Sequence, residues 1–272
     1  MKQLVSTNWL QENINKVKIF DASWHLPASN RNAIGEFENC CIKNSIFFDI
    51  DKNSDNSSSL PHMLPTKKAW EETLSSYGIK NSDHVIIYDN SNLISSCRVW
   101  YNFLYFNHDP NYVSVLDGGL KKWLIEKKPT FRGKSIKKFS YSNYKSKENN
   151  FMVLSKDEIN ENIKNKTFEL VDARSKDRFL GLVAESRKEL RSGNIKGSKN
   201  LPFTELINDN KTFKKKSELS YVFKKNKINL DKNLAFTCGS GITACILGLA
   251  NSIINDKKPV IYDGSWAEYG IK

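Results

Sequence analysis

Cys238 is the residue in this sequence whose neighbours best suit it to act as a nucleophile. It follows a short apolar run, Leu234–Thr237, and precedes glycines at positions 239 and 241, after which a helical pattern opens at Thr243-Ala244. Backbone N–H groups of a tight loop at a helix start stabilise a thiolate and lower a thiol's pKa. The glycines let the backbone curl around one sulfur atom without a Cβ clash. This setting favours a nucleophilic cysteine over a buried structural one.

A nucleophile of this kind needs groups that bind its substrate, and Arg178 and Arg187 are candidates. They follow a predicted strand ending at Asp172, on the sheet edge where the Cys238 loop should also emerge. A guanidinium group can bind a carboxylate through two parallel hydrogen bonds. In a chain with 42 lysines and arginines, two arginines by themselves indicate little. Arg191 is a weaker candidate, which a turn would equally explain.

Asp51 and His62 form a second possible constellation. Asp51 lies just beyond an apolar run and His62 lies in a Pro-His-Met-Leu-Pro loop. A carboxylate bonded to an imidazole orients the ring and fixes its tautomer. An isolated pair of this type more often stabilises a loop, so the residues alone leave both interpretations open.

The elements that must position these residues occur twice. In each copy a helix pattern with a serine N-cap candidate (Ser6, Ser155) leads to an apolar strand that ends in Asp-Ala. Three strand ends recur with similar offsets of 151, 149 and 146 residues: Asp21 and Asp172, Asp89 and Cys238, Asp117 and Asp263. Strands that alternate with helices predict a mainly parallel sheet with helices on both faces.

The repeat predicts an α/β protein of two tandem domains. We expect a first domain over residues 1–126, a polar, basic linker over 127–150 and a second domain over 151–272. The first copy has Asp89 where the second has Cys238, so it cannot do thiol chemistry there. Cys97, at the start of a helix pattern in the first copy, is expected to be structural. The second domain should therefore react while the first shapes the cleft.

Composition excludes several classes of function. With 39% hydrophobic and 11% aromatic residues the chain is globular, and no apolar run approaches the ~20 residues of a membrane span. The five cysteines and four histidines form no zinc-type spacing, so we expect neither metal nor cofactor. The net charge of +12 comes mainly from dispersed lysines, which favours a solvated surface over nucleic-acid binding. Reduced cysteines and no apparent targeting segment favour the cytoplasm.

The segment Cys238-Gly-Ser-Gly-Ile-Thr-Ala244 resembles the active-site loop of the rhodanese superfamily. The Gly-Ser after the cysteine is similar to the 3-mercaptopyruvate sulfurtransferase branch, whereas the thiosulfate-using branch typically has basic side chains there. The fold's phosphatase relatives place an arginine where this chain has Ala244. The resemblance extends over essentially the whole chain and implies tandem rhodanese-like domains.

The resemblance also implies roles for individual residues. Arg178 and Arg187, in Arg-Phe-x-Gly-x-x-x-Glu-x-Arg, resemble the family's carboxylate clamp. Asp51, His62 and Ser240 match a proposed proton relay across the domain interface. The remaining substrate-binding positions implied by the loop are Gly239, Gly241, Ile242 and Thr243. Ile94 stands where many relatives have an aromatic residue near the cleft, and Cys41-Ile-Lys and Asn194-Ile-Lys replace the family's His-Ile-Pro.

The implied reaction is sulfur transfer in two steps. Cys238 takes sulfur from 3-mercaptopyruvate, a small anionic donor, releases pyruvate, and passes the persulfide sulfur to cyanide or to a thiol such as thioredoxin or a low-molecular-weight thiol. The alternatives are a thiosulfate sulfurtransferase and a persulfide carrier with little turnover of small molecules. Neither a membrane nor a nucleic acid is expected as a partner.

Overall fold

The computed structural model describes residues 3–132 and 139–272, which divide into two compact units. Unit 1 comprises the described residues within Met1–Asn56, Pro65–Asn149 and Asp209–Thr212. Unit 2 comprises Ser57–Leu64, Asn150–Asn208 and Phe213–Lys272. The segment with His62 therefore groups with the second half of the chain. Residues 133–138 of the predicted linker lie outside the described residues.

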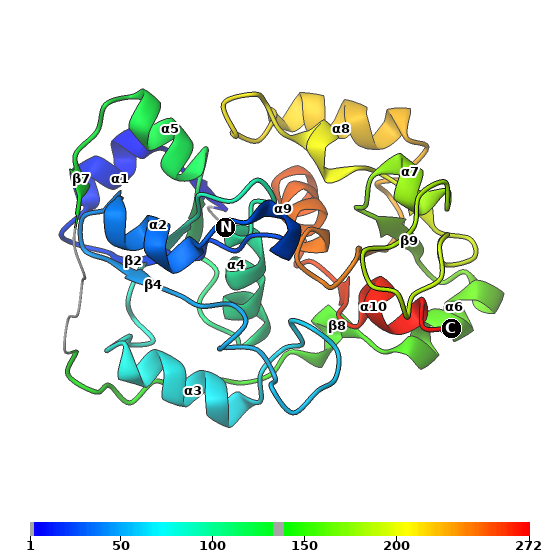
Figure 1. Cartoon of the computed structure of the whole chain (residues 1–272), viewed down its shortest axis with the longest axis horizontal. Helices are drawn as coiled ribbons and strands as arrows, with labels where there is room; N and C mark the ends of the chain where they lie inside the picture. The colour runs from blue at the N-terminus through cyan, green and yellow to red at the C-terminus, as the bar shows by residue number, and fades with distance from the viewer. Residues whose placement is uncertain (1–2, 133–138) are drawn as a thin grey trace. The chain divides into compact units, whose positions relative to one another are not determined.

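Unit 1 is built on a five-stranded parallel sheet in the order β1-β6-β5-β2-β4. Figure 1 labels the neighbouring strands β2 and β4 of this sheet. Its strands are β1 (Leu4–Val5), β2 (Lys18–Asp21), β4 (Ser45–Phe47), β5 (Val85–Tyr88) and β6 (Val113–Leu116), and β3 (Cys41–Ile42) pairs antiparallel with β7 (Thr130–Phe131). Its helices are α1 (Thr7–Asn13), α2 (Ala33–Asn39), α3 (Lys67–Ser76), α4 (Ser96–Tyr105) and α5 (Gly119–Ile125), with a 3₁₀ turn at Pro27–Ser29.

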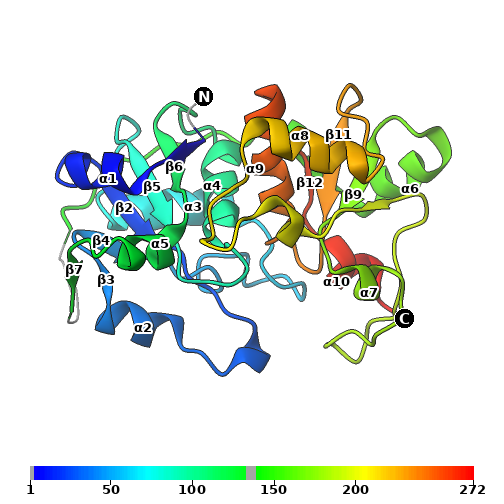
Figure 2. The same ribbon diagram turned by 90° about the horizontal axis from the view of Figure 1, so that it is seen from above.

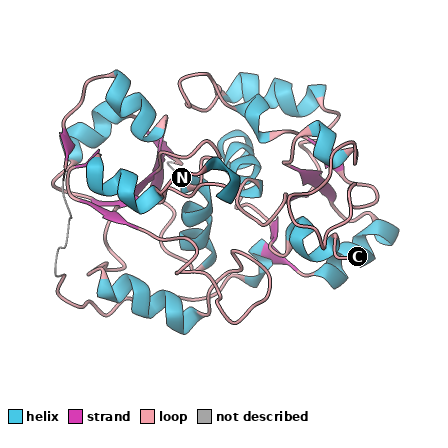
Figure 3. Ribbon diagram, in the orientation of Figure 1, coloured by secondary structure: helices cyan, strands magenta, loops and turns pink. Residues whose placement is uncertain are grey.

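Unit 2 repeats this plan with the order β10-β9-β11-β12-β8, again all parallel. Its strands are β8 (Val153–Leu154), β9 (Glu169–Asp172), β10 (Lys199–Asn200), β11 (Leu234–Thr237) and β12 (Ile261–Tyr262). Its helices are α6 (Lys156–Asn165), α7 (Lys176–Phe179), α8 (Lys216–Lys225), α9 (Ala244–Asn255) and α10 (Ser265–Tyr269), with 3₁₀ turns at Asn150–Met152 and Phe203–Leu206. The predicted α/β fold of two mainly parallel sheets is confirmed, and Figure 3 shows helices around the strands of each unit.

Each sheet buries both faces because alternate side chains of its strands point to opposite sides. In unit 1, Ile19 and Ile86 pack with Leu10 of α1 and Trp123 of α5. The neighbouring Phe20 points to the other face, where its ring contacts Phe103 of α4 at a centroid distance of 6.2 Å. In unit 2, one face packs Leu170 and Ala235 with residues of α6 and α10, while α9 contacts β11 and β12.

Local capping also follows the sequence. The Ser6 side chain accepts a hydrogen bond from Trp9 N at 3.1 Å, and Ser155 forms a capping box with Glu158. These bonds satisfy N–H groups that have no partner within a helix's first turn. Both predicted N-caps are confirmed. They fix where the first helix of each repeat begins, and thus where the following strand enters its sheet.

The described end of the predicted linker, residues 139–149, packs on unit 1. Ser142 N donates to Ser75 O at 3.0 Å, and the buried Tyr144 lies with its hydroxyl 3.1 Å from His108 Nδ1. The other ring nitrogen, Nε2, lies 3.1 Å from the carbonyl oxygen of Asp83. Burial lowers the pKa of His108, which keeps the imidazole neutral and able to accept from the tyrosine.

Candidate active site

The loop from Cys238 to Thr243 connects β11 to α9 and is fixed by the residues that follow β12. Ser265 Oγ accepts hydrogen bonds from the N–H groups of Cys238, at 3.3 Å, and Gly241, at 3.1 Å. The same hydroxyl donates to the carbonyl oxygen of Tyr262 at 2.8 Å. Ser265 is fully buried and adopts a φ of 49°, a left-handed conformation that is uncommon for serine. One hydroxyl therefore holds both ends of the cysteine turn.

The first turn of α10 supports the loop from the same side. Trp266 N donates to Cys238 O at 3.0 Å, and Ala267 N donates to Gly239 O at 2.8 Å. Gly241 has a φ of 78°, where a side chain would strain the backbone, which explains the glycine at this position. Cys238 itself is buried, while Gly239 and Ser240 are half-buried.

Several loop N–H groups are left available for an anion. Within the described residues, the N–H groups of Gly239, Ser240, Ile242 and Thr243 have no hydrogen-bond acceptor. Gly241 donates its own N–H to Ser265. Its predicted role as a substrate-binding position stays a prediction. Amides of this kind stabilise negative charge that develops on a bound sulfur or oxygen atom.

Cys245 lies at the start of α9, directly after the cysteine loop. Because the loop is not helical before Ala244, Cys245 is the second residue of the helix. Its buried thiol donates to Gly241 O at 3.1 Å. It thus packs beneath the loop as a structural residue, as Cys97 does in α4 of unit 1, where it is fully buried.

Arg178 approaches the cysteine loop directly. Its Nη2 lies 3.3 Å from the position that a Cβ on Gly239 would occupy, so the guanidinium fills the space beside that glycine. The side chain is 36% exposed and Nη2 donates to Glu185 Oε2 at 2.5 Å. One part of the guanidinium is thus held by the protein, and the rest faces outward.

Glu185 belongs to a buried charge network that sequence reasoning missed. Its Oε1 accepts from Arg174 Nη1 at 2.8 Å, and Arg174 pairs in turn with Asp172 through Nε and Nη2. The Arg174 guanidinium also lies 4.5 Å from the centre of the Trp266 ring. This network connects the end of β9 to Arg178 and to α10. A signal was present in the repeat, since Arg174 replaces Ser23 directly after the shared Asp-Ala.

Arg187 is the less constrained of the two predicted clamp residues. It is half-buried, and its carbonyl oxygen accepts from Leu190 N at 3.1 Å in a turn. Within the described part of the chain, its guanidinium has no hydrogen bond or ion pair. Arg191, by contrast, stacks on Trp266 at 4.7 Å and donates to Tyr269 O at 3.2 Å. Arg187 is therefore the better placed for a carboxylate, and Arg191 has a structural explanation.

His62 and Ser240 are brought together within unit 2. His62 Nδ1 lies 2.9 Å from Ser240 Oγ, and the imidazole is buried. The segment is held to unit 2 because Leu64 N donates to the Asp263 carboxylate at 2.8 Å. Two members of the predicted relay are thus in hydrogen-bond contact beside Cys238.

Asp51, the third member of the predicted relay, belongs to unit 1. Its two carboxylate oxygens accept from Trp24 Nε1 at 3.0 and 2.9 Å. With Trp24, His25, Arg31 and Asp49, it lines a polar hollow of about 310 Å³. The link from Asp51 to His62 stays a prediction.

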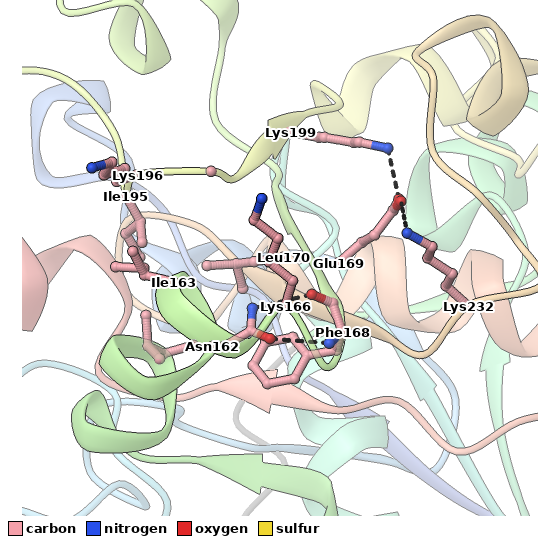
Figure 4. Close-up of a pocket in the computed structure, with 12 residues that line it drawn as sticks. Asn162, Ile163, Lys166, Phe168, Glu169, Leu170, Ile195, Lys196, Lys199 and Lys232 are labelled. Atoms are coloured by element: carbon pink, nitrogen blue, oxygen red, sulfur yellow. Dashed lines mark hydrogen bonds and ion pairs between the residues drawn. The ribbon is translucent and has the colours of Figure 1, made fainter.

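Unit 2 has a separate hollow of about 180 Å³ at the start of β9, shown in Figure 4. Its walls are apolar side chains such as Ile163 and Leu170, and lysines lie around it. Glu169 is paired there with Lys199 at 2.8 Å and Lys232 at 3.6 Å. Cys238, however, follows the carboxyl end of β11, a parallel strand paired with β9. This hollow therefore lies at the opposite end of the sheet from the cysteine loop.

Residues 3–132 and 139–272 contain neither a metal-binding cluster nor a membrane-spanning helix. No cluster of three or more His, Cys, Asp or Glu side chains there is arranged to hold a metal ion. No helix there combines the length and apolar character that crossing a bilayer requires. All five cysteines are free thiols.

Comparison with known proteins agrees with this geometry. A family model for the rhodanese-like domain matches residues 6–126 and again 155–272. Mouse 3-mercaptopyruvate sulfurtransferase is 37% identical over 98% of this chain and 92% of its own length. Thiosulfate/3-mercaptopyruvate sulfurtransferase 1, mitochondrial, from Arabidopsis thaliana is also 37% identical, over 98% of this chain and 75% of its own length.

A solved structure extends the similarity to three dimensions. The crystal structure of SseA from Escherichia coli, described as showing the rhodanese fold and catalytic mechanism of 3-mercaptopyruvate sulfotransferases, matches with a TM-score of 0.88 and 31% sequence identity. The match covers 98% of this chain and 99% of that one.

Proposed function

This chain is a sulfurtransferase of the rhodanese-like family with two domains, and on that premise we propose that its sulfur donor is 3-mercaptopyruvate. The observation that carries the choice of donor is the 2.9 Å contact between His62 Nδ1 and Ser240 Oγ. A carbon leaving group must take up a proton before it becomes pyruvate, whereas the sulfite released from thiosulfate needs none. A hydroxyl bonded to an imidazole beside the nucleophile supports the first reaction.

In the first half-reaction, the carboxylate of the donor binds Arg187 and the outward part of Arg178. The Cys238 thiolate attacks the donor sulfur, and a new S–S bond forms as the donor C–S bond breaks. The electron pair of that bond stays on carbon, as the enolate of pyruvate, which then takes a proton by way of Ser240 and His62. The products are pyruvate and a Cys238 persulfide.

The cysteine loop should also stabilise negative charge on sulfur. It can do so through the available amides of Gly239, Ser240, Ile242 and Thr243. Negative charge on the persulfide, and on Cys238 when it leaves again, would be stabilised by these N–H groups without movement of the backbone. An acceptor thiolate or cyanide then attacks the outer sulfur. The Cys238 thiolate is regenerated, so initial-rate kinetics should follow a ping-pong pattern.

Pyruvate release and persulfide formation test the proposal together. Cys238→Ser should abolish pyruvate release from 3-mercaptopyruvate. It should also abolish the increase of about 32 Da in the protein's intact mass that one added sulfur atom causes. Cys40→Ser is the matched control, since Cys40 is a half-buried free thiol at the end of α2 in unit 1 and should leave both unchanged. Persulfidation of the Cys238→Ser protein would contradict the nucleophile assignment.

Thiosulfate is the second candidate donor, because the Arabidopsis relative carries both substrates in its name. Ser240→Ala separates the two donors. It should lower kcat with 3-mercaptopyruvate by about 100-fold, the lower range for a lost general acid, and change thiosulfate turnover little. An equal loss with both donors would show that Ser240 shapes the loop rather than moving a proton.

A persulfide carrier is the remaining alternative. It would form the Cys238 persulfide but show little turnover of either donor.

The acceptor and the compartment belong to the same proposal. We infer a thiol acceptor, either a thioredoxin-type protein or a low-molecular-weight thiol, and a reducing compartment such as the cytoplasm, which the five free cysteines support. One relative is named as mitochondrial, so fractionation of cells with a tagged chain decides between the two compartments.

A further inference from the structure

An exposed apolar segment lies between the two arginines of the proposed clamp. Leu180, Leu182 and Val183, here called the apolar loop, are 50%, 70% and 43% exposed. They follow α7, which carries Arg178, and precede Arg187. Large apolar side chains that cluster on a surface are typical of sites where another protein docks.

The apolar loop is held in one conformation by hydrogen bonds. Leu182 N donates to Asp177 O at 2.9 Å, and Gly181 N donates to Arg178 O at 3.2 Å. From the neighbouring turn, Ser192 Oγ donates to Val183 O at 3.1 Å. The loop therefore presents its apolar side chains on a bonded backbone, which lowers the entropy cost of binding a partner.

Gly181 explains why the loop can be so tightly folded. It has a φ of 73°, and a Cβ there would lie 3.1 Å from Gly193 N. Asn194 ties the same two segments together by donating from Nδ2 to Phe179 O at 2.9 Å. Residues 180–197 thus form one supported projection beyond α7, which Figure 2 shows in yellow-green.

The apolar loop directly follows the helix whose Arg178 reaches the reacting loop. Arg178, two residues before Leu180, contacts the space beside Gly239, the residue after Cys238. A protein seated on the apolar loop would thus be beside the persulfide. A small thiol could reach the sulfur without touching these side chains, so the loop favours a protein acceptor.

The charges around the apolar loop favour an acidic partner. Lys176, Lys188 and Arg191 are exposed and Arg187 is half-buried, against the exposed acids Asp177 and Glu189. The chain as a whole carries a net charge of +12. Attraction between a basic surface and an acidic one accelerates association and is weakened by salt.

We propose that the apolar loop is the docking surface for a protein acceptor with a reactive thiol. Apolar side chains surround that thiol, and the rest of the acceptor's binding surface is acidic. The inference rests on the proposed function and adds the acceptor's binding site to it. In the transfer step the partner thiolate attacks the outer persulfide sulfur, forming a new S–S bond as the Cys238–sulfur bond breaks. Cys238 leaves as a thiolate and the partner becomes the persulfide, so charge and atoms balance.

The experiment compares two acceptors for one enzyme. Leu182→Ser and the double variant Leu180→Ser/Leu182→Ser are assayed for pyruvate release from 3-mercaptopyruvate, with either cyanide or a reduced thioredoxin of acidic pI as acceptor. Loss of one anchoring side chain should lower kcat/KM for the protein acceptor about tenfold, and for cyanide by less than about twofold. Tyr221→Ser is the matched control, because Tyr221 is 67% exposed on α8 of the same unit.

The outcomes separate this inference from the proposed function. Equal turnover of wild type and Leu182→Ser with thioredoxin would overturn the docking surface, as would an equal loss with thioredoxin and cyanide. A wild-type protein that forms no persulfide from 3-mercaptopyruvate would instead overturn the proposed function.

Lys188→Glu tests the charge attraction separately. It should weaken sulfur transfer to the acidic thioredoxin at low salt and leave it unchanged at high salt, where the charges are screened.

Discussion

The loop after β5 and the loop after β11 stand at equivalent places in the two repeats, but their amides have different partners. In unit 1 the Asp89 carboxylate accepts from Ser91 N at 2.8 Å and from Ser96 N at 3.1 Å. In unit 2 the loop amides of Gly239, Ser240, Ile242 and Thr243 are without acceptors among the described residues. Unit 1 thus closes its loop with a carboxylate of its own, whereas unit 2 keeps donors for a bound anion.

The aspartates at the ends of β2 and β9 differ in the same way. Asp172 is paired with Arg174, and through Glu185 this pair holds Arg178 beside the cysteine loop. Asp21 instead accepts hydrogen bonds from Ser23, and burial raises its pKa to about 7. Replacing one serine by arginine therefore changes a self-contained strand end into a charged scaffold for a substrate-binding side chain.

The largest effect should come from breaking that scaffold. Arg174→Leu leaves two buried carboxylates, Asp172 and Glu185, without their cation, and removal of one partner from a buried pair costs about 3–5 kcal/mol. The equivalent change in unit 1, Ser23→Ala, removes the hydroxyl's hydrogen bonds with Asp21 and Asn90 and should cost about 1 kcal/mol. Urea unfolding of both variants measures the difference. Similar losses of unfolding free energy in the two variants would mean that the ends of β2 and β9 contribute equally to stability.

A smaller effect is expected from opening the loop of unit 1. Asp89→Ala leaves the buried amides of Ser91 and Ser96 without an acceptor, which should lower the free energy of unfolding by about 1–3 kcal/mol. Sulfur transfer by folded protein should be unchanged, because the Asp89 carboxylate bonds amides of its own loop. Asn92→Ala, at an exposed position of the same loop, is the control. A large fall in kcat at full folding would show that the Asp89 loop takes part in the reaction.

The last effect is graded, because it is spread over several pH units. Burial raises the pKa of Asp21 to about 7, with Ser23 hydrogen bonds acting in the opposite direction, so the folded state holds a proton that the unfolded state has lost. This contribution to stability is complete below 3.8, the ordinary pKa of an aspartate, and is lost as pH rises to about 7. Asp21→Asn should therefore gain stability relative to wild type by up to ~1 kcal/mol per pH unit across this window, and the difference should level off above it. If the difference in thermal unfolding between Asp21→Asn and wild type did not change with pH, the raised pKa of Asp21 would be contradicted.

Features carried by neighbouring residues were predictable from the sequence. The apolar runs that end in Asp-Ala, the serine caps and the glycines around Cys238 each depend on contacts within a few residues, so pattern reveals them. Both sheets, their shared order and the position of the cysteine at a strand end agree with those patterns. The repeat was visible because each copy must bury the same strand faces, and it predicted the two-domain α/β fold.

The remaining features depend on residues that the chain brings together from a distance. Ser265 fixes the Cys238 turn from 27 residues further along. The ion pair between Glu185 and Arg178 is joined through Arg174 to the end of β9, which no hydrophobic pattern indicates. His62 meets Ser240 across 178 residues, and groups with unit 2 despite its place in the first copy. Residue types and spacing determined which groups could react. Only tertiary packing decided which of their hydrogen bonds are used by the protein and which are left for a ligand, because each donor's partner comes from another element.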